Sequence, residues 1–175
     1  MSKKSKRVKQ SGRTTHSSPI NQQRHNTMAS VAPSQLHEAL MQRVEYARQQ
    51  MHMGDFAACI RTCEALLNTL PRRSEIRLEI LSLSGLAHGM LKHYQQSYDV
   101  FSEAIALDPT IAELWHNRGL ACSCMSRIAE AVRNFEHAVE LAKNDTGELA
   151  HRFALQLEAS RQELQDAMQA HEAGI

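Results

Sequence analysis

The chain of 175 residues lacks any long apolar run, either near its start or later. A membrane-spanning helix needs about 20 predominantly apolar residues, and a secretory signal needs a shorter apolar core after a basic stretch. Because neither pattern is present, we expect no membrane span and no export by the usual signal route. A cytoplasmic protein with reduced thiols is the resulting prediction.

Motifs for metals, phosphates and nucleophilic catalysis are also missing. The four cysteines are Cys59, Cys63, Cys122 and Cys124, and neither pair has the C-x2-C spacing of a zinc site. No glycine-rich phosphate loop occurs, and no nucleophile lies in a motif with a base. We therefore expect no enzyme activity, no cofactor and no metal site. Cys59 and Cys63 are interpreted as compact apolar residues of the core.

Acidic residues are absent from the first 33 positions, which also hold almost nothing large and apolar. The basic residues of this segment are Lys3, Lys4, Lys6, Arg7, Lys9, Arg13 and Arg24. Such a composition cannot offset the entropy lost on ordering, so residues 1–33 are predicted to be a disordered basic arm. With 20 basic and 19 acidic residues in the whole chain, 13 bases face 19 acids in residues 34–175, which leaves that part with a net charge of −6.

The basic arm is compatible with several roles. Clusters of lysine and arginine bind nucleic acid, acidic membrane surfaces or acidic proteins, and Lys3 to Arg7 has the composition of a nuclear import signal. The plainest alternative is a solvated tail without a partner. A nucleic-acid-associated or ribosome-associated protein that uses this arm is thus one hypothesis for function.

The remainder of the chain contains a pattern that recurs after 34 residues. The recurring pairs are Leu81 and Trp115, Gly85 and Gly119, Tyr94 and Ile128, Phe101 and Phe135, and Ala104 and Ala138. A unit of this length holds two helices and a turn, but it cannot bury its apolar face alone. The pattern therefore predicts a stack of helical hairpins.

The period and the residue types resemble the tetratricopeptide repeat, a helix-turn-helix unit of 34 residues. The resemblance implies repeats at residues 40–73, 78–111 and 112–145 and a capping helix at residues 146–170. The implied fold is an all-α, right-handed solenoid over residues 34–170. It also implies a non-catalytic protein-interaction module, an adaptor or scaffold.

Small residues give this pattern a physical basis. Gly85 and Gly119 fall opposite Ser97 and Ala131 of the following helices, where small side chains let two backbones approach closely. Gly54, followed by an aspartate that can cap the next helix, predicts a turn. The positions of the hairpins are therefore set by chemistry as well as by period.

The first helix of each repeat has a second face, which lines the inner surface of a curved stack. The residues predicted to form this groove are Met41, Val44, Arg48, Met51, Glu79, Ser82, Leu86, Met90, Glu113, His116, Asn117 and Leu120. Because this face is unusually apolar and contains methionines, we expect it to bind an extended or helical segment of a partner protein. The alternatives are coverage by the basic arm, by the last helix, or by a second copy of the chain through self-association.

Overall fold

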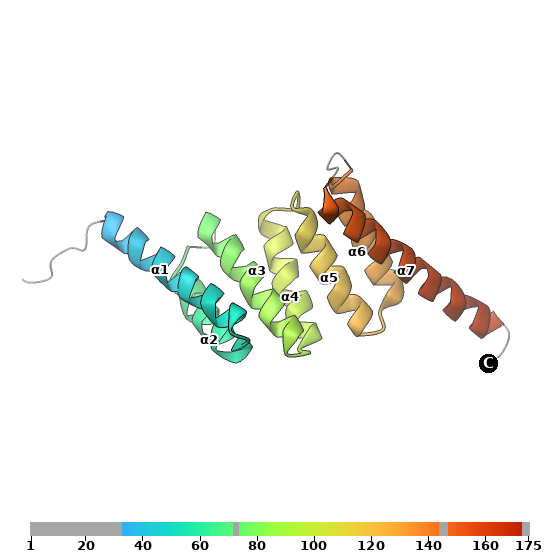
Figure 1. Cartoon of the computed structure of the whole chain (residues 1–175), viewed down its shortest axis with the longest axis horizontal. Coiled ribbons are helices and arrows are strands. Elements are labelled where there is room, and N and C mark those ends of the chain that lie inside the picture. The colour runs from blue at the N-terminus through green and yellow to red at the C-terminus, as the bar shows by residue number, and fades with distance from the viewer. Residues whose placement is uncertain (1–32, 72–73, 144–146, 173–175) are drawn as a thin grey trace, which may run out of the picture.

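The computed structural model describes residues 33–71, 74–143 and 147–172, and every regular element in these ranges is an α-helix. The helices are α1 (Pro33–His52), α2 (Phe56–Leu67), α3 (Glu75–Met90), α4 (Tyr94–Leu107), α5 (Ala112–Cys124), α6 (Ile128–Leu141) and α7 (Glu148–Glu172). They form a row of helix-turn-helix units, α1–α2, α3–α4 and α5–α6, with α7 at the end (Figure 1). The predicted all-α helical repeat solenoid is confirmed.

The helices at the two ends of the row differ in length from the expected repeat bounds. α1 begins at Pro33, whereas the first repeat was expected from residue 40. Proline suits the first position of a helix, because its missing amide hydrogen would have no acceptor there. α7 begins at Glu148 and ends at Glu172, slightly later at each end than the expected 146–170. The predicted basic arm, apart from Pro33, lies outside the described residues.

Each hairpin turn contains one residue with a positive φ angle. These residues are Gly54 (φ 78°), Lys92 (φ 61°) and Ser126 (φ 58°). After Gly54, the carboxylate of Asp55 accepts a hydrogen bond from the Ala58 amide at 3.1 Å and caps α2. A left-handed backbone is strained for residues that carry a Cβ atom. At Lys92 and Ser126 the following amide bonds back to the preceding helix, from His93 to the His88 carbonyl oxygen and from Arg127 to the Cys122 carbonyl oxygen, each at 2.9 Å, which offsets this strain.

In the second and third units, a phenylalanine of the second helix packs on a glycine of the first helix. A Cβ atom added to Gly85 would lie 2.8 Å from Cζ of Phe101, and one added to Gly119 would lie 2.6 Å from Cε1 of Phe135. Carbon atoms in contact prefer about 3.5–4.0 Å, so neither position has room for a side chain. Ser97 adds a hydrogen bond from its Oγ to the Gly85 carbonyl oxygen at 2.8 Å. The predicted close-packing role of the two glycines is confirmed.

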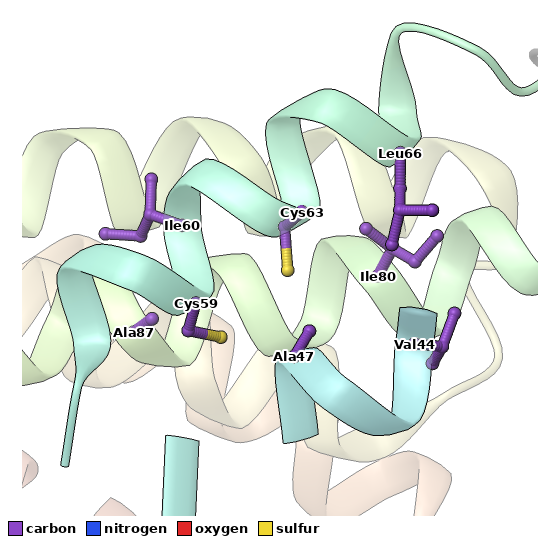
Figure 2. Packing of buried hydrophobic residues seen from close by; sticks show 8 residues of the cluster. All are labelled: Val44, Ala47, Cys59, Ile60, Cys63, Leu66, Ile80 and Ala87. Carbon is purple, nitrogen blue, oxygen red and sulfur yellow. The ribbon is translucent and has the colours of Figure 1, made fainter. Parts of the chain in front are cut away.

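The first unit packs on the second through a core of small and branched side chains (Figure 2). The buried residues of this core are Val44, Ala47, Cys59, Ile60, Cys63, Leu66, Ile80 and Ala87. Cys59 and Cys63 have no exposed surface, which confirms their predicted role as core residues. Desolvation raises the pKa of both thiols, so that they stay protonated at neutral pH.

The last helix packs on the third unit by one face only. Phe153 and Leu157 of α7 are buried against residues of α5 and α6. The ring of Phe153 stacks on the ring of His116 in α5, with centroids 4.5 Å apart. α7 therefore occupies the place of a next unit and caps the row, as the predicted fold requires.

Candidate partner-binding groove

A pocket of about 300 Å³ opens between α3 and α5 and also includes residues of α4. It is lined by Gly85, Leu86, Gly89, Met90, Tyr94, Ser97, Phe101, Asn117, Leu120, Ala121 and Cys124. Ligand sites in proteins measure about 300–1,000 Å³, so this pocket is at the small end of that range. Its size suits one large side chain of a partner better than an organic cofactor.

The pocket owes its apolar, open character to two features of α3. A Cβ atom added to Gly89 would touch only Oγ of Ser97, at 3.5 Å, so the missing side chain leaves free space. Leu86 and Met90 are large and apolar, yet they are 39% and 59% exposed. Exposed apolar residues around a hollow are typical of binding surfaces rather than of solvated helix faces.

The structure brings four of the predicted groove residues together in this pocket. They are Leu86, Met90, Asn117 and Leu120. Met41 is exposed on α1, and Met51 packs on the first core cluster. The hydroxyl of Ser82 donates a hydrogen bond to the Leu78 carbonyl oxygen at 3.0 Å within its own helix. The apolar part of the predicted groove is thus concentrated between the second and third units.

Arg48 and Glu79 pair with each other across the first two units. The Arg48 guanidinium donates to the Glu79 carboxylate and also to the Glu45 carboxylate one turn away in α1. Ion pairs between exposed side chains contribute little to stability, about 0–1 kcal/mol. They do, however, neutralise the charges of this part of the groove.

Glu113 is the remaining charged residue of the predicted set. It is exposed in the first turn of α5, and it forms no ion pair with any residue in the described ranges. Asn117 lies one turn further along the same helix, at the edge of the pocket. A negative charge therefore flanks the apolar pocket on the α5 side.

Val44 and His116 do not line the groove, contrary to the sequence prediction. Val44 is 1% exposed and packs in the same cluster as Ile80 of α3 (Figure 2). His116 is 7% exposed, and its ring contacts the rings of Phe135 and Phe153, with centroids 5.5 and 4.5 Å away. Both residues are on the inner face of a helix, but the next element of the row, α3 or α7, covers that position.

Lowering the pH from about 7.5 to about 5.5 is expected to destabilise the fold, because two histidines are held neutral. Burial lowers the pKa of His116 and the pKa of His88 below the usual 6.5. The unfolded chain therefore binds protons more readily, and the free energy of unfolding decreases as the pH falls below 6.5. Urea denaturation at the two pH values, followed by circular dichroism, measures the change.

His88 offers the matched variant for that measurement. Its buried Nδ1 has no hydrogen-bond partner among the described residues, and its ring centroid lies 5.8 Å from that of His93. His88→Leu removes this unsatisfied atom and is expected to raise the free energy of unfolding at pH 7 by about 1 kcal/mol. The variant should also lose part of the pH dependence. Equal urea midpoints for the parent at both pH values would contradict the explanation.

Tyr94 and Cys124 line the pocket although the sequence analysis did not select them. The repeat contained a signal for Cys124, since it follows Met90 by one period of 34 residues. Tyr94 begins α4, and its place depends on how α4 crosses the neighbouring first helices, which the period does not specify. Desolvation, with a further contribution from the neighbouring Cys124 thiol, raises the pKa of Tyr94.

The polar groups of the pocket do not form a reaction centre of a recognised kind. They are the side chains of Tyr94, Ser97, Asn117 and Cys124, and the Ser97 hydroxyl already donates to a backbone carbonyl. Among residues 33–71, 74–143 and 147–172, no group of three or more His, Cys, Asp or Glu side chains is placed to hold a metal ion. Within the same ranges, no helix has both the length and the apolar composition needed to cross a membrane.

Comparison with protein families gives a match over the third unit. Residues 112–145 match the family model described as the tetratricopeptide repeat. A curated relative from Dictyostelium discoideum, a DnaJ homolog subfamily C member 7 homolog, is 37% identical over 57 residues. That match covers 30% of this chain but only 11% of the relative, so the chain spans a small part of that protein's length.

Solved structures extend the likeness to most of the chain. The type III secretion chaperone SycD of Yersinia enterocolitica, in complex with a peptide of the translocator YopD, has a TM-score of 0.66 at 20% identity, and the match covers 72% of this chain and 95% of the SycD chain. The TPR domain of Sgt2 from Aspergillus fumigatus has a TM-score of 0.65 at 18% identity and covers 75% and 82%. At these identities the likeness shows the fold alone. Residues 112–145 thus match the tetratricopeptide repeat itself, and the solved structures show that most of the chain has the same fold of stacked helical hairpins.

Proposed function

We propose that this chain is a non-catalytic protein-interaction module that holds a short segment of a partner protein between α3 and α5. The observation that carries the proposal is the apolar pocket of about 300 Å³ with the exposed walls Leu86 and Met90. Exposing such a surface to water is unfavourable in free energy, and covering it with an apolar side chain is favourable.

The size of the pocket supports one anchor residue in the bound segment. Burying a leucine, methionine or phenylalanine side chain contributes about 1.5–3 kcal/mol. The segment also loses conformational freedom when it binds, so the net affinity is expected to be modest. A basic residue next to the anchor would face Glu113, whereas Glu79 is already paired with Arg48.

The structural neighbours support this use of the fold. SycD was solved with a peptide of its translocator bound, and its chain superposes on most of the helices described here. Low identity means that neither the partner nor the binding motif can be carried over. The partner of this chain is therefore defined only by its chemistry: an apolar anchor with a basic neighbour.

The test combines selection of a ligand with a charge-introducing double variant. A random peptide library displayed on phage is selected on the full-length chain, and the recovered peptide is titrated by calorimetry. Leu86→Glu with Leu120→Glu places two carboxylates in the pocket, and it is expected to weaken binding at least about tenfold, since 1.4 kcal/mol corresponds to a factor of ten. Leu155→Glu is the matched control, because Leu155 is 59% exposed on α7, outside the pocket.

Two outcomes would contradict the proposal. The first is equal affinity of the selected peptide for the double variant and for the parent, because such a peptide does not use the pocket. Binding that disappears with increasing salt, but is insensitive to the double variant, would favour the nucleic-acid or acidic-partner hypothesis for the basic arm. That hypothesis stays a prediction, since the cationic residues Lys3 to Arg24 lie outside the described part of the chain.

A further inference from the structure

We propose that the chain's own residues 19–24 occupy the pocket when no partner is bound, with Ile20 as the apolar anchor and Arg24 beside Glu113. The inference rests on the proposed function, because it assigns a competitor to the same pocket. It makes the N-terminal segment a regulator of the groove rather than a separate binding element.

The length of the preceding chain limits which residue can reach the pocket. α1 contains 20 residues and is therefore about 30 Å long. The pocket lies level with the far end of α1, because its residues come from the last two turns of α3 and α5, which run in the same direction as α1 (Figure 1). Adjacent helix axes lie about 8–10 Å apart, so a straight path from Pro33 to the pocket measures roughly 35 Å.

Ile20 is within that reach, and Met28 is not. Pro33 follows Ile20 by thirteen positions, and an extended chain of that length spans about 43 Å. The five residues from Met28 to Pro33 span only about 16 Å. Ile20 is also a large β-branched residue in a segment that is otherwise polar, so the pocket has a single good anchor at this distance.

The spacing along the chain also allows a cation to reach the unpaired carboxylate. Glu113 precedes Leu120 by seven residues, which is about 10 Å along the helix. Arg24 follows Ile20 by four residues, a reach of about 13 Å when extended. Arg24 can therefore meet Glu113 while Ile20 fills the pocket.

The overall charge distribution favours the same contact. All seven basic residues before position 33 lack acidic neighbours in the sequence, while residues 34–175 have a net charge of −6. Opposite net charges increase the frequency of encounter between the two parts. Because the segment is covalently attached, its effective concentration at the pocket is in the millimolar range, so even a weak contact is populated.

Cys124 provides a native probe of occupancy. It is the exposed cysteine and lines the pocket, whereas Cys59, Cys63 and Cys122 are buried. Burial raises the pKa of Cys122 to about 11 and raises the pKa of the other two buried thiols as well, so all three react slowly. The rate at which iodoacetamide modifies Cys124, followed by peptide mass spectrometry, therefore reports how often the pocket is covered.

The experiment uses the full-length chain and three variants. Ile20→Asp and Arg24→Glu are expected to increase the alkylation rate of Cys124 about threefold or more, as a site that is mostly occupied becomes mostly open. Met28→Asp is the matched control for Ile20→Asp, since both replace an apolar side chain with a carboxylate, and Met28 is beyond the reach of the pocket. Its rate should equal that of the parent.

The outcomes separate this inference from the proposed function. Equal Cys124 rates in the parent and Ile20→Asp overturn the inference, even if the selected peptide still binds the pocket. A rate that falls with increasing protein concentration also overturns it, because a second copy would then be the occupant. Support consists of faster alkylation in Ile20→Asp and Arg24→Glu at constant concentration, with about threefold tighter peptide binding to Ile20→Asp.

Discussion

Phe135→Ala is expected to lower the free energy of unfolding by about 3–5 kcal/mol. The ring of Phe135 has no exposed surface and fills the space left by Gly119, while it also contacts the ring of His116. Its removal leaves a cavity that the rigid helices around it can close only in part. Urea denaturation at neutral pH, followed by circular dichroism at helical wavelengths, gives the change directly.

Leu155→Ala is the control for this measurement, because Leu155 is exposed and should cost less than about 0.5 kcal/mol. The contact with Gly119 supplies a second check. Gly119→Ala should destabilise the parent, since the new methyl group would overlap the Phe135 ring, and it should cost less in a Phe135→Leu background. Additive effects of these two changes would show that the glycine and the ring do not constrain each other.

Phe153→Ala is expected to lower the free energy of unfolding by a similar amount, about 3–5 kcal/mol. The destabilisation should, however, be concentrated in a different part of the chain. Phe153 is fully buried and attaches α7 to the third unit through its stack on His116. In a row of units, each unit contacts mainly its neighbours, so destabilisation spreads little beyond the adjacent unit. Hydrogen exchange measured by mass spectrometry should show lost protection in residues 148–172 first.

The first unit serves as an internal reference in the same experiment. The amides of α2 should keep their protection in Phe153→Ala, because α2 packs on α1 and α3. Loss of protection at equal rates in α2 and α7 would mean that the row unfolds as one cooperative body. In that case α7 would be an integral part of a single core rather than a cap.

The sequence was sufficient to predict the hairpins because their requirements are local. The 34-residue period, the glycines facing Phe101 and Phe135, and the turn at Gly54 each express a steric need of one unit. The turns at Lys92 and Ser126 have no such signature, because residues that carry a Cβ atom take the left-handed position there, held by backbone hydrogen bonds from His93 and Arg127 to the preceding helices. Periodicity therefore located these turns although their residue types did not.

The groove was harder to predict because it depends on contacts between units. Val44 and His116 have the same repeat position as Ser82, which the helical pattern places on the inner surface, but α3 and α7 cover the two of them. Trp115, one period after the buried Leu81, is only half-buried: it packs against the edge of two core clusters, and its Nε1 donates to the Pro109 carbonyl oxygen at 2.8 Å. The helical period assigns each residue to a face of its own helix. Whether the side chain is exposed depends on how far the neighbouring helix extends over that face.

The pairing of Arg48 with Glu79 reduces the number of residues in a ligand whose type the groove can specify. Along the α1–α3 part of the inner surface, these two side chains satisfy each other, while the α3–α5 part offers one apolar pocket flanked by Glu113. If a ligand is recognised through one apolar anchor and one adjacent cation, its binding motif fixes the residue type at only two sequence positions. Two-position motifs are frequent in any set of proteins, so selectivity among them has to come from local abundance and from further contacts outside the pocket.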